Sequence, residues 1–572
     1  MKHLKTFLMA TAATAMVASA AQAASHAKRG SAGQLNIIYW QAPSTLNPYL
    51  SGGTKDIESA SLIIEPLAKY NEVGELVPAL VDEIPTVANG GVAEDLKSIT
   101  WKLKEGLKWS DGSAVTANDA VFTWKYCTHP EGGCAQAAQF ADVSNMEAID
   151  DRTLKISFSV AKPVPYGPLT GGQSPVIQEA QFKDCLGAKA PECTSANFGP
   201  IGTGPFVVTE FKPNDVIQYK ANENYRDPNK PAFATVLFKG GGDAAAAARS
   251  VLETGEFHYA WNMQIEPEVL AAMEAKGLGK VHSSYGTSVE RMMINQTNPD
   301  SALGDKRSTI EGGAHPFLSD PNVVKALSLA IDRSILVEAG YGPSGQVTCN
   351  VLPAPQAYAS TANDECKTQD VAKANELLDA AGWKDSDGDG IREKDGMKLA
   401  VLYQTSTNGV RQGTQALVKQ MWKAVGVDAE LRNLDASVFF GGDPSSPDTF
   451  QKFYADIEMY TNNFNGTDPE KYMAGWQCDK IPSPANGWQG TNIQRFCNAD
   501  YDALVAELAK TAEPAKRQEL AKKMNDMLIQ SGSIIPLVHR GRVSAISNKL
   551  TGIKHNAWDS EIWNAADWDL AK

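Results

Sequence analysis

The chain has 572 residues, of which 43% are hydrophobic and 21% are charged, and its formal net charge is −14. This length exceeds what one compact core accommodates and favours about three or four domains. The composition is that of a folded, soluble protein. The acidic balance argues against nucleic acid as a partner, because such a partner favours a basic surface.

The N-terminus has the pattern of a secretory signal. Lys2 and Lys5 give a positive start, residues 7–20 form an Ala-rich apolar run, and Ala21-Gln22-Ala23 is a small-x-small cleavage site. The apolar run is short for a membrane span, and later stretches are shorter still. We therefore expect residues 1–23 to be a signal peptide and the mature chain to be exported and soluble.

The first part of the mature chain is predicted to alternate strands, loops and helices. Residues 35–40 (LNIIYW) are typical of a buried strand, and residues 51–54 (SGGT) of a flexible loop. A helix is expected over residues 56–67. Residues 103–124 predict a strand, a tight turn at Ser110-Asp111-Gly112 and a helix capped by Thr116 or Asn118.

Further along, the pattern keeps its α/β character. Strands are predicted at residues 152–160, 207–211, 291–295, 399–403, 534–538 and 543–546. Helices are predicted at residues 243–252, 319–339, 370–381, 411–425, 501–510 and 516–529. The helix at residues 319–339 is expected to be continuous, with Val324, Leu327, Ile331 and Ile335 on its inner face.

The eight cysteines fall into four neighbouring couples, and an exported protein can oxidise them. Neighbour pairing predicts four disulfides, each closing a small local loop: Cys127–Cys134, Cys185–Cys193, Cys349–Cys366 and Cys478–Cys497. A metal site at these cysteines is disfavoured because no C-x-x-C spacing occurs.

Five short motifs follow one another along the chain. They are Glu105–Gly112 (EGLKWSDG), Thr116–Thr123 (TANDAVFT), Ile201–Phe206 (IGTGPF), Lys212–Asp215 with Asn222–Tyr225, and Asp320–Arg333. Together they resemble the peptide- and nickel-type (family 5) extracellular solute-binding proteins of bacterial ABC importers, including periplasmic dipeptide- and oligopeptide-binding proteins. The resemblance runs from about Leu35 to Ile553. Val324 stands where the family usually has Arg, and His258 where it usually has Asp.

The resemblance implies an α/β, two-lobed periplasmic binding protein fold of class II, of the large peptide-binding type with an extra subdomain and a hinge between lobes. The implied division places residues 33–75, 199–285 and 536–572 in lobe 1 (subdomain I). Residues 76–198 would form subdomain II, and residues 286–535 would form lobe 2 (subdomain III).

The sequence offers little support for catalysis or for a cofactor. There is no H-E-x-x-H, no G-x-S-x-G and no Walker loop. Gly340–Gly345 matches G-x-G-x-x-G but follows a helix, so it is not a dinucleotide site. Asp385–Gly390 resembles half of a calcium loop, with Gly396 where the closing Glu would stand; a polar turn is the alternative. We expect no cofactor, no resident metal and no enzymatic activity.

The ligand site is inferred mainly from the resemblance. In dipeptide and oligopeptide binders an Asp in the segment matching Met459–Pro469 pairs with the peptide amine, and here Asn463 stands at that point. Arg411, at a predicted helix start, matches a carboxylate-binding Arg, with a solvated Arg as the alternative. The full set of candidate ligand-binding residues is Tyr39, Trp40, Gly53, Thr54, Tyr403, Asn408, Arg411, Tyr460, Asn463, Phe464 and Trp476; Trp488 is a further aromatic candidate. The aromatic members are as compatible with core positions as with a ligand wall.

These features predict a substrate-binding component of an ABC transporter that captures a di- or oligopeptide and delivers it to the permease in the inner membrane. A monomer is expected, without nucleic acid. Closure of the lobes on the solute would be a population shift. The alternatives are the same fold with another solute (an opine, an oligosaccharide or a metal complex), and a secreted glycoside- or peptide-cleaving enzyme.

Overall fold

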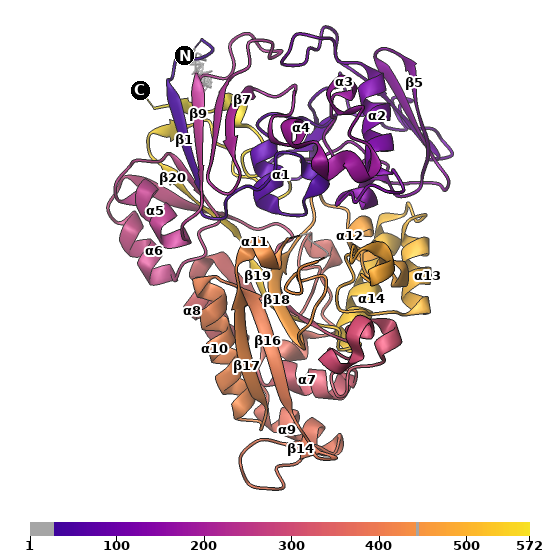
Figure 1. The fold of residues 1–572 in the computed structure, drawn as a ribbon, viewed down its shortest axis with the longest axis vertical. Helices are drawn as coiled ribbons and strands as arrows, with labels where there is room; N and C mark the ends of the chain where they lie inside the picture. Colours follow the sequence, from indigo (N-terminus) through magenta and orange to yellow (C-terminus); the bar gives the residue numbers. More distant parts are fainter. Residues whose placement is uncertain (1–27, 442–444, 572) are drawn as a thin grey trace, which may run out of the picture.

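The computed structural model describes residues 28–441 and 445–571. The predicted signal peptide, residues 1–23, lies outside the described residues. Within the described part of the chain, no helix combines the length and the apolar character that crossing a bilayer requires. The molecule divides into an upper and a lower part, here called the first and second lobe, each built on its own large sheet (Figure 1).

The first lobe contains a seven-stranded sheet assembled from distant parts of the chain. Its central strand β1 (Gln34–Tyr39) runs parallel to β9 and β10, and the other neighbours are antiparallel. Helices α5 (Ala244–Leu252) and α6 (Pro267–Glu274) pack on one side, and Asp243 caps α5 as predicted. The strand order is β11 (Gly279–Ser284), β20 (Arg542–Ser547), β10 (Tyr259–Trp261), β1, β9 (Thr235–Gly240), β8 (Val216–Ala221) and β7 (Phe206–Lys212).

A three-stranded sheet extends the first lobe and carries the motif at residues 103–124. The order is β4 (Ser98–Lys102), β6 (Thr153–Phe158) and β5 (Val143–Asp150), and helix α2 (Ala117–Cys127) packs on β5 and β6. Thr116 and Asp119 form a capping box at the start of α2, which confirms the predicted Thr116 cap. Trp109 donates to the Asp119 carboxylate at 3.3 Å, so the turn is tied to the helix it precedes. Short helices complete this lobe: α1 (Thr54–Ala60), α3 (Glu179–Phe182) and α4 (Thr194–Phe198).

The second lobe is built on a six-stranded sheet with helices on both faces (Figure 1). Its order is β13 (Gly345–Val347), β19 (Ile534–Arg540), β12 (Val289–Ile294), β18 (Ile457–Asn462), β16 (Ala400–Ser406) and β17 (Asp428–Leu434). One face packs against α8 (Arg333–Gly340) and α10 (Gly409–Lys423), and the other against α14 (Pro514–Gln530) with α12 (Glu470–Ala474) and α13 (Ala499–Leu508). Two separate apolar cores result, one on each face. The remaining helices are α7 (Pro321–Leu329), α9 (Val371–Ala380) and α11 (Ala436–Phe439).

Three two-stranded ribbons account for the remaining strands. They are β2 (Ala68–Tyr70) with β3 (Leu76–Pro78), β14 (Glu393–Lys394) with β15 (Met397–Lys398), and β21 (Leu550–Thr551) with β22 (Asp569–Leu570).

The prediction of one continuous helix at residues 319–339 was wrong. Asp320 begins α7 as expected, but the chain leaves the helix after Ala330, and α8 starts anew at Arg333. Asp332 is the reason, because its carboxylate accepts the backbone N–H groups of Ser334 and Ile335 as an N-cap. The break turns Ile335 outward, where its side chain is 42% exposed.

Two short segments connect the lobes. One joins β11 to β12 through Gly286, and the other joins β19 to β20 through Gly541. A Cβ at Gly286 would lie 2.3 Å from the Ala557 carbonyl oxygen, so this crossing needs glycine for close approach. A Cβ at Gly541 would lie 2.2 Å from Ser283 Oγ, so the Ser283 side chain would have to move. The return to lobe 1 was expected at residue 536, whereas the whole of β19 pairs within the second sheet and the change comes at Gly541.

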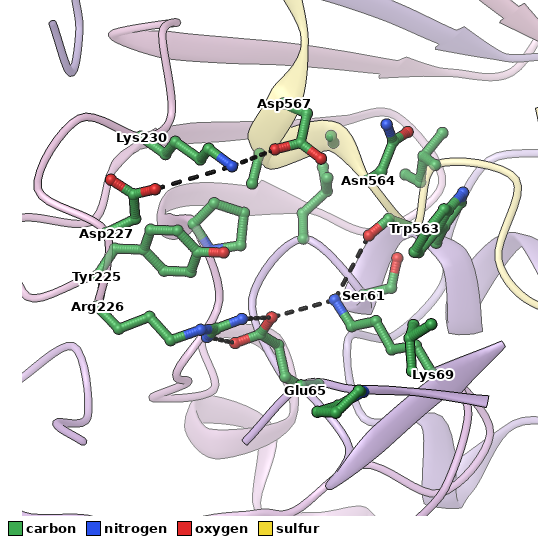
Figure 2. A pocket seen from close by; sticks show the side chains of 18 residues that line it. Ser61, Glu65, Lys69, Tyr225, Arg226, Asp227, Lys230, Trp563, Asn564 and Asp567 are labelled. Atoms are coloured by element: carbon green, nitrogen blue, oxygen red, sulfur yellow. Dashed lines mark hydrogen bonds and ion pairs between the residues drawn. The ribbon is translucent and has the colours of Figure 1, made fainter. Parts of the chain in front are cut away.

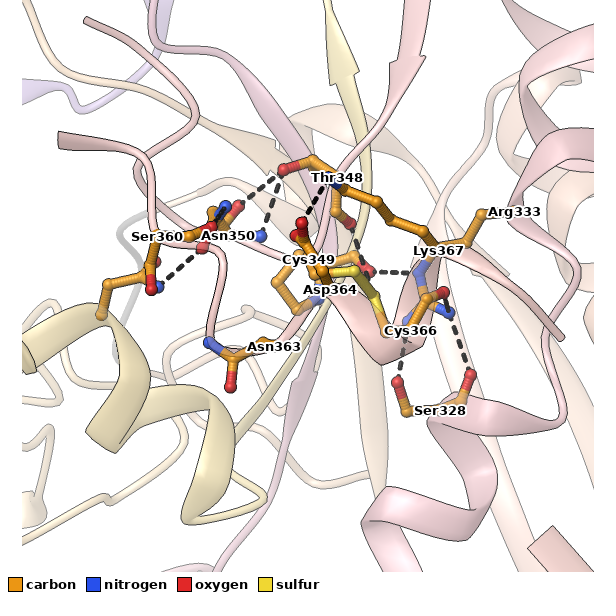
Figure 3. Close-up of a disulfide and its surroundings, with 12 residues drawn as sticks. Ser328, Arg333, Thr348, Cys349, Asn350, Ser360, Asn363, Asp364, Cys366 and Lys367 are labelled. Carbon is orange, nitrogen blue, oxygen red and sulfur yellow. Dashed lines mark hydrogen bonds and ion pairs between the residues drawn. A yellow bond between two sulfur atoms is a disulfide. The ribbon is translucent and has the colours of Figure 1, made fainter. Parts of the chain in front are cut away.

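All four neighbour disulfides predicted from the cysteine spacing are present, with Cα–Cα distances of 4.7–5.9 Å. Figure 3 shows Cys349–Cys366, which ties the loop after β13 to the segment before α9. Arg333 reaches this loop and donates to the Cys366 carbonyl oxygen at 2.9 Å and to Ser328. Each disulfide therefore closes a short loop of the chain.

Candidate functional site

The two lobes touch along a polar contact in which both partners are buried. Lys162 of the first lobe and Glu470 of α12 lie 2.6 Å apart, and their side chains are only 4% and 8% exposed. The neighbouring Lys471 donates to the Gln139 carbonyl oxygen at 2.8 Å. The backbone N–H of Gly466 donates to the Trp558 carbonyl oxygen at 2.7 Å. Residues 466–471 are thus the part of the second lobe that closes against the first.

A second set of contacts lies at the N-terminus of α10. Asn408 caps this helix by accepting the backbone N–H of Arg411 at 2.9 Å, as predicted for a helix start. The Asn408 amide also donates across the lobe boundary to Gln264 at 3.2 Å. Arg540, at the end of β19, reaches Asn262 of the first lobe at 2.6 Å. The α10 N-terminus therefore lies at the lobe boundary.

The guanidinium of Arg411 is already paired within the protein. Its Nε donates to Glu290 Oε1 at 2.9 Å, and Nη1 donates to Ser406 at 2.9 Å. Both side chains of the ion pair are buried, at 5% and 1% exposure. Burial would raise the pKa of Glu290, but Arg411 and Arg540 outweigh it and hold that pKa below its usual value. Glu290 forms its ion pair with Arg411, while Arg540 bonds to Thr461 and Asn262 and acts on Glu290 through its charge.

The opposite face of β12 carries a second arginine, Arg291, which is 0% exposed. Its Nη1 donates to the Tyr472 hydroxyl. Its guanidinium lies over the rings of Tyr472 and Trp476, 5.6 Å and 5.1 Å from their centroids. Its Nε and Nη2, and the Nε1 of Trp476, have no hydrogen-bond partner. This face therefore presents buried donors that nothing in the described chain satisfies.

Two buried acceptors lie on the same sheet. Gln404 donates to Glu458 Oε1 at 2.6 Å, which leaves Glu458 Oε2 and Gln404 Oε1 without partners. Burial raises the pKa of Glu458 well above its usual value. Glu458 precedes Tyr460 by two residues on β18, and Tyr460 is paired with Arg291 in the antiparallel register. The polar groups of Arg291 and Glu458 therefore flank one aromatic ring.

Three of the predicted ligand residues are buried: Tyr39 and Tyr403 lie inside their lobes, and Trp40 lies beside Asn262, which Arg540 of the second lobe contacts. Tyr39 donates to Glu58, and its ring stacks on Trp261 at 4.7 Å. Burial and then Glu561 raise the pKa of Glu58 to about 8, so this pair is part of a buried network in the first lobe. Trp40 donates to the Asn262 carbonyl oxygen at 2.8 Å. Tyr403 is 0% exposed, and its hydroxyl contacts Met459 Sδ in the core of the second lobe.

The segment around Tyr460 lies at the lobe boundary. Phe464 exchanges hydrogen bonds with Thr287 at 2.6 Å and 3.0 Å, and its ring lies 4.9 Å from that of Tyr472. Asn463 is half-buried, and its side-chain amide has no hydrogen-bond partner among the described residues. The structure brings together Tyr460, Phe464 and Trp476, with Asn463 beside them in the chain.

The other candidates lie away from this cluster. Gly53 and Thr54 begin α1 and are partly exposed. Trp488 packs edge-on against Tyr454 at 5.9 Å, with Lys452 over its ring.

A separate hollow of about 250 Å³ lies within the first lobe (Figure 2). Its charged groups are paired with each other: Arg226 makes two bonds to Glu65, and Lys69 makes a third. Burial opposes ionisation of Glu65, but Arg226 and then Lys69 lower its pKa to about 2. Lys230 pairs with Asp567 at 2.5 Å. These pairs connect the chain's beginning, middle and end, and we interpret them as a structural brace.

The acidic turn at Asp385–Gly390 brings three carboxylates together. Oxygens of Asp385, Asp387 and Glu393 lie within 4.8 Å of one another. Both oxygens of Asp385 accept backbone N–H groups, from Gly388 at 2.8 Å and Gly390 at 3.1 Å. This is the bonding of a polar turn, and a metal site is not assigned to it.

Two sheet-based lobes joined by two short crossings, with buried polar groups along their contact, define a two-lobed binding protein fold. The chain belongs to the bacterial extracellular solute-binding proteins, family 5, whose middle region matches residues 75–488. It is 24% identical over 515 residues to the glutathione-binding protein GsiB of Escherichia coli K12, covering 89% of each chain.

Solved structures show the same fold. The chain is similar to the oligopeptide-binding protein AppA of Bacillus subtilis in complex with a nonapeptide, with a TM-score of 0.80, 20% identity and coverage of 95% of this chain and 100% of the other. It is also similar to NikZ of Campylobacter jejuni in complex with Ni(L-His), with a TM-score of 0.77, 20% identity and coverage of 94% and 99%.

Sequence reasoning missed four charged residues at the centre of the site: Glu290, Arg291, Glu458 and Arg540. Glu290 and Arg291 stand inside an otherwise apolar strand, Val289–Ile294. A charged pair within such a run is a usable signal, because unpaired charges are rarely buried without a function. Their partners are distant in the chain, so their roles are visible only in the fold.

Proposed function

We propose that this protein captures a peptide between its lobes and delivers it to an ABC permease in the inner membrane. One observation carries this proposal: buried hydrogen-bonding groups without partners lie next to the segment of the second lobe that contacts the first. A peptide supplies carboxylates, amines and backbone groups that can satisfy both donors and acceptors. Names of similar proteins support this class of solute, since GsiB is a glutathione-binding protein and AppA binds a nonapeptide.

The working cycle would use the two crossings at Gly286 and Gly541 as the hinge. We propose that the crossings separate lobe 1 from lobe 2, with the last boundary at Gly541, and that residues 76–198 form a subdomain within the first lobe. Solute binding would favour the closed arrangement through contacts that only the closed form provides. We propose that the protein acts as an exported monomer after cleavage near Ala23, and that it releases its solute without chemical change.

A panel of peptides tests this function. We expect at least one di- to pentapeptide at about 100 times its Kd to stabilise the protein by about 2.7 kcal/mol, which a thermal-shift assay detects as a rise in melting temperature. The panel should include L-histidine with Ni²⁺, an opine and an oligosaccharide, because NikZ is similar in fold and binds Ni(L-His). Stabilisation by one of these, and by no peptide, would contradict the peptide assignment.

A further inference from the structure

Arg291 is a charged group for which the described chain provides no counter-charge. It is fully buried in the middle of β12, and Tyr472 is the hydrogen-bond partner of its Nη1. No carboxylate among the described residues forms an ion pair with it. On the other face of β12, by contrast, Glu290 is paired with Arg411 of α10.

Burying the Arg291 guanidinium without an anionic partner is unfavourable. A guanidinium remains charged at any physiological pH, so it cannot avoid the cost of burial by losing its proton. An uncompensated buried charge costs several kcal/mol. The aromatic faces of Tyr472 and Trp476 recover part of this cost, but they leave the in-plane Nε and Nη2 donors unused.

The neighbouring groups determine what kind of partner fits. Trp476 adds a third unpartnered donor, its indole Nε1. These three unpartnered N–H groups belong to two side chains in contact, one of them cationic, and such donors suit a carboxylate. Glu458 is on the adjacent strand, but its Oε1 accepts a hydrogen bond from Gln404 and its Oε2 has no partner, so it does not bond to Arg291.

The side chains that cover Arg291 belong to a segment that also contacts the first lobe. Tyr472 and Trp476 lie in the same short segment of the chain as Gly466 and Glu470, which contact the first lobe. When the lobes separate, this segment loses its cover, and when they close it is sealed again. A solute held between the lobes can therefore place one group against Arg291 and have it enclosed on closure.

We propose that Arg291, together with Trp476, binds an anionic group of the solute and makes the protein selective for peptides that carry one. The group is a carboxylate, which can come from an acidic side chain or from the peptide C-terminus. This inference rests on the proposed peptide-binding function, and it assigns to Arg291 the role that the sequence suggested for Arg411, whose charge is already neutralised by Glu290.

The test compares the wild-type protein with Arg291→Met in calorimetric titrations of three peptides: Ala-Glu-Ala, Ala-Gln-Ala and Ala-Gln-Ala amide. If Arg291 binds an acidic side chain, the wild type prefers Ala-Glu-Ala to Ala-Gln-Ala by about 10- to 100-fold and the variant loses this preference. If it binds the C-terminus, the wild type prefers Ala-Gln-Ala to its amide and the variant loses that preference. Arg249→Met, an exposed arginine on α5, is the matched control and should change neither.

Stability provides a second readout that separates binding from packing. Because Arg291→Met removes an uncompensated buried charge, we expect the ligand-free variant to melt at a higher temperature than the wild type. Unchanged peptide preferences in the variant would overturn the role of Arg291 while leaving peptide binding intact. Failure of the wild type to bind any of the three would overturn the role of Arg291, and the peptide-binding function would fall with it only if the di- to pentapeptide panel also gave no stabilisation. A lower melting temperature with unchanged preferences would show that Arg291 only packs.

Discussion

Replacing Glu290 with glutamine is expected to destabilise the second lobe by about 3–5 kcal/mol, because it leaves Arg411 and Arg540 without their shared counter-charge. Arg411 donates to both carboxylate oxygens of Glu290, at 2.9 Å and 3.5 Å, and its remaining bonds go to hydroxyls, which carry no charge. Chemical denaturation of the ligand-free protein, followed by circular dichroism, measures the loss.

The double variant Glu290→Gln with Arg540→Gln is the control for this prediction. It removes one positive charge together with the negative one, so part of the lost stability should return. A single variant as stable as the wild type would contradict the buried ion pair. It would also reopen the possibility that Arg411 is free to bind a solute carboxylate.

Replacing Lys162 with methionine is expected to lower peptide affinity by about 100-fold or more. Lys162 and Glu470 come from opposite lobes and are both buried, and Lys162 also pairs with Asp142 of its own lobe at 2.8 Å. Without Lys162, closure would bury the Glu470 carboxylate without its partner, at a cost of about 3–5 kcal/mol, and each 1.4 kcal/mol corresponds to a tenfold change in affinity. The population of the closed form and the apparent affinity fall together.

Calorimetry with a bound peptide and small-angle scattering at saturating peptide check this prediction. The variant should bind more weakly and remain more extended on average. The double variant Lys162→Met with Glu470→Met should recover most of the affinity, because an apolar pair can replace a buried ion pair. Lys516→Met removes a surface pair with Glu519 and serves as the neutral control. Equal affinity in Lys162→Met and the wild type would show that this contact does not control closure.

Local features of the chain were predictable from sequence. The Thr116 cap, the Asp243 cap and the four neighbour disulfides depend on residues within about twenty positions of each other. Such features depend on short-range geometry that a sequence window contains. The break between α7 and α8 was missed because the apolar spacing continues across Asp332, although that residue can itself cap a helix.

The candidate site was less accessible to sequence reasoning, because its partners are far apart in the chain. Arg411 and Glu290 are separated by 121 positions, and Lys162 and Glu470 by 308. Arg411 was correctly expected at a helix start, but the carboxylate that occupies it comes from a strand in another part of the second lobe. Glu290 and Arg291 are neighbours on β12, so their side chains point to opposite faces of the sheet. Glu290 therefore meets Arg411, whereas Arg291 points to the face on which it has no carboxylate partner.

The most direct test of capture between the lobes is mass spectrometry of the solute that copurifies with the protein from the bacterial periplasm. The protein should be isolated without denaturant, desalted and then unfolded to release what it holds. We expect close to one peptide per protein molecule, with a free carboxylate, and a reduced yield from the Arg291→Met variant. Recovery of a sugar, an opine or a metal complex at the same stoichiometry would contradict the account.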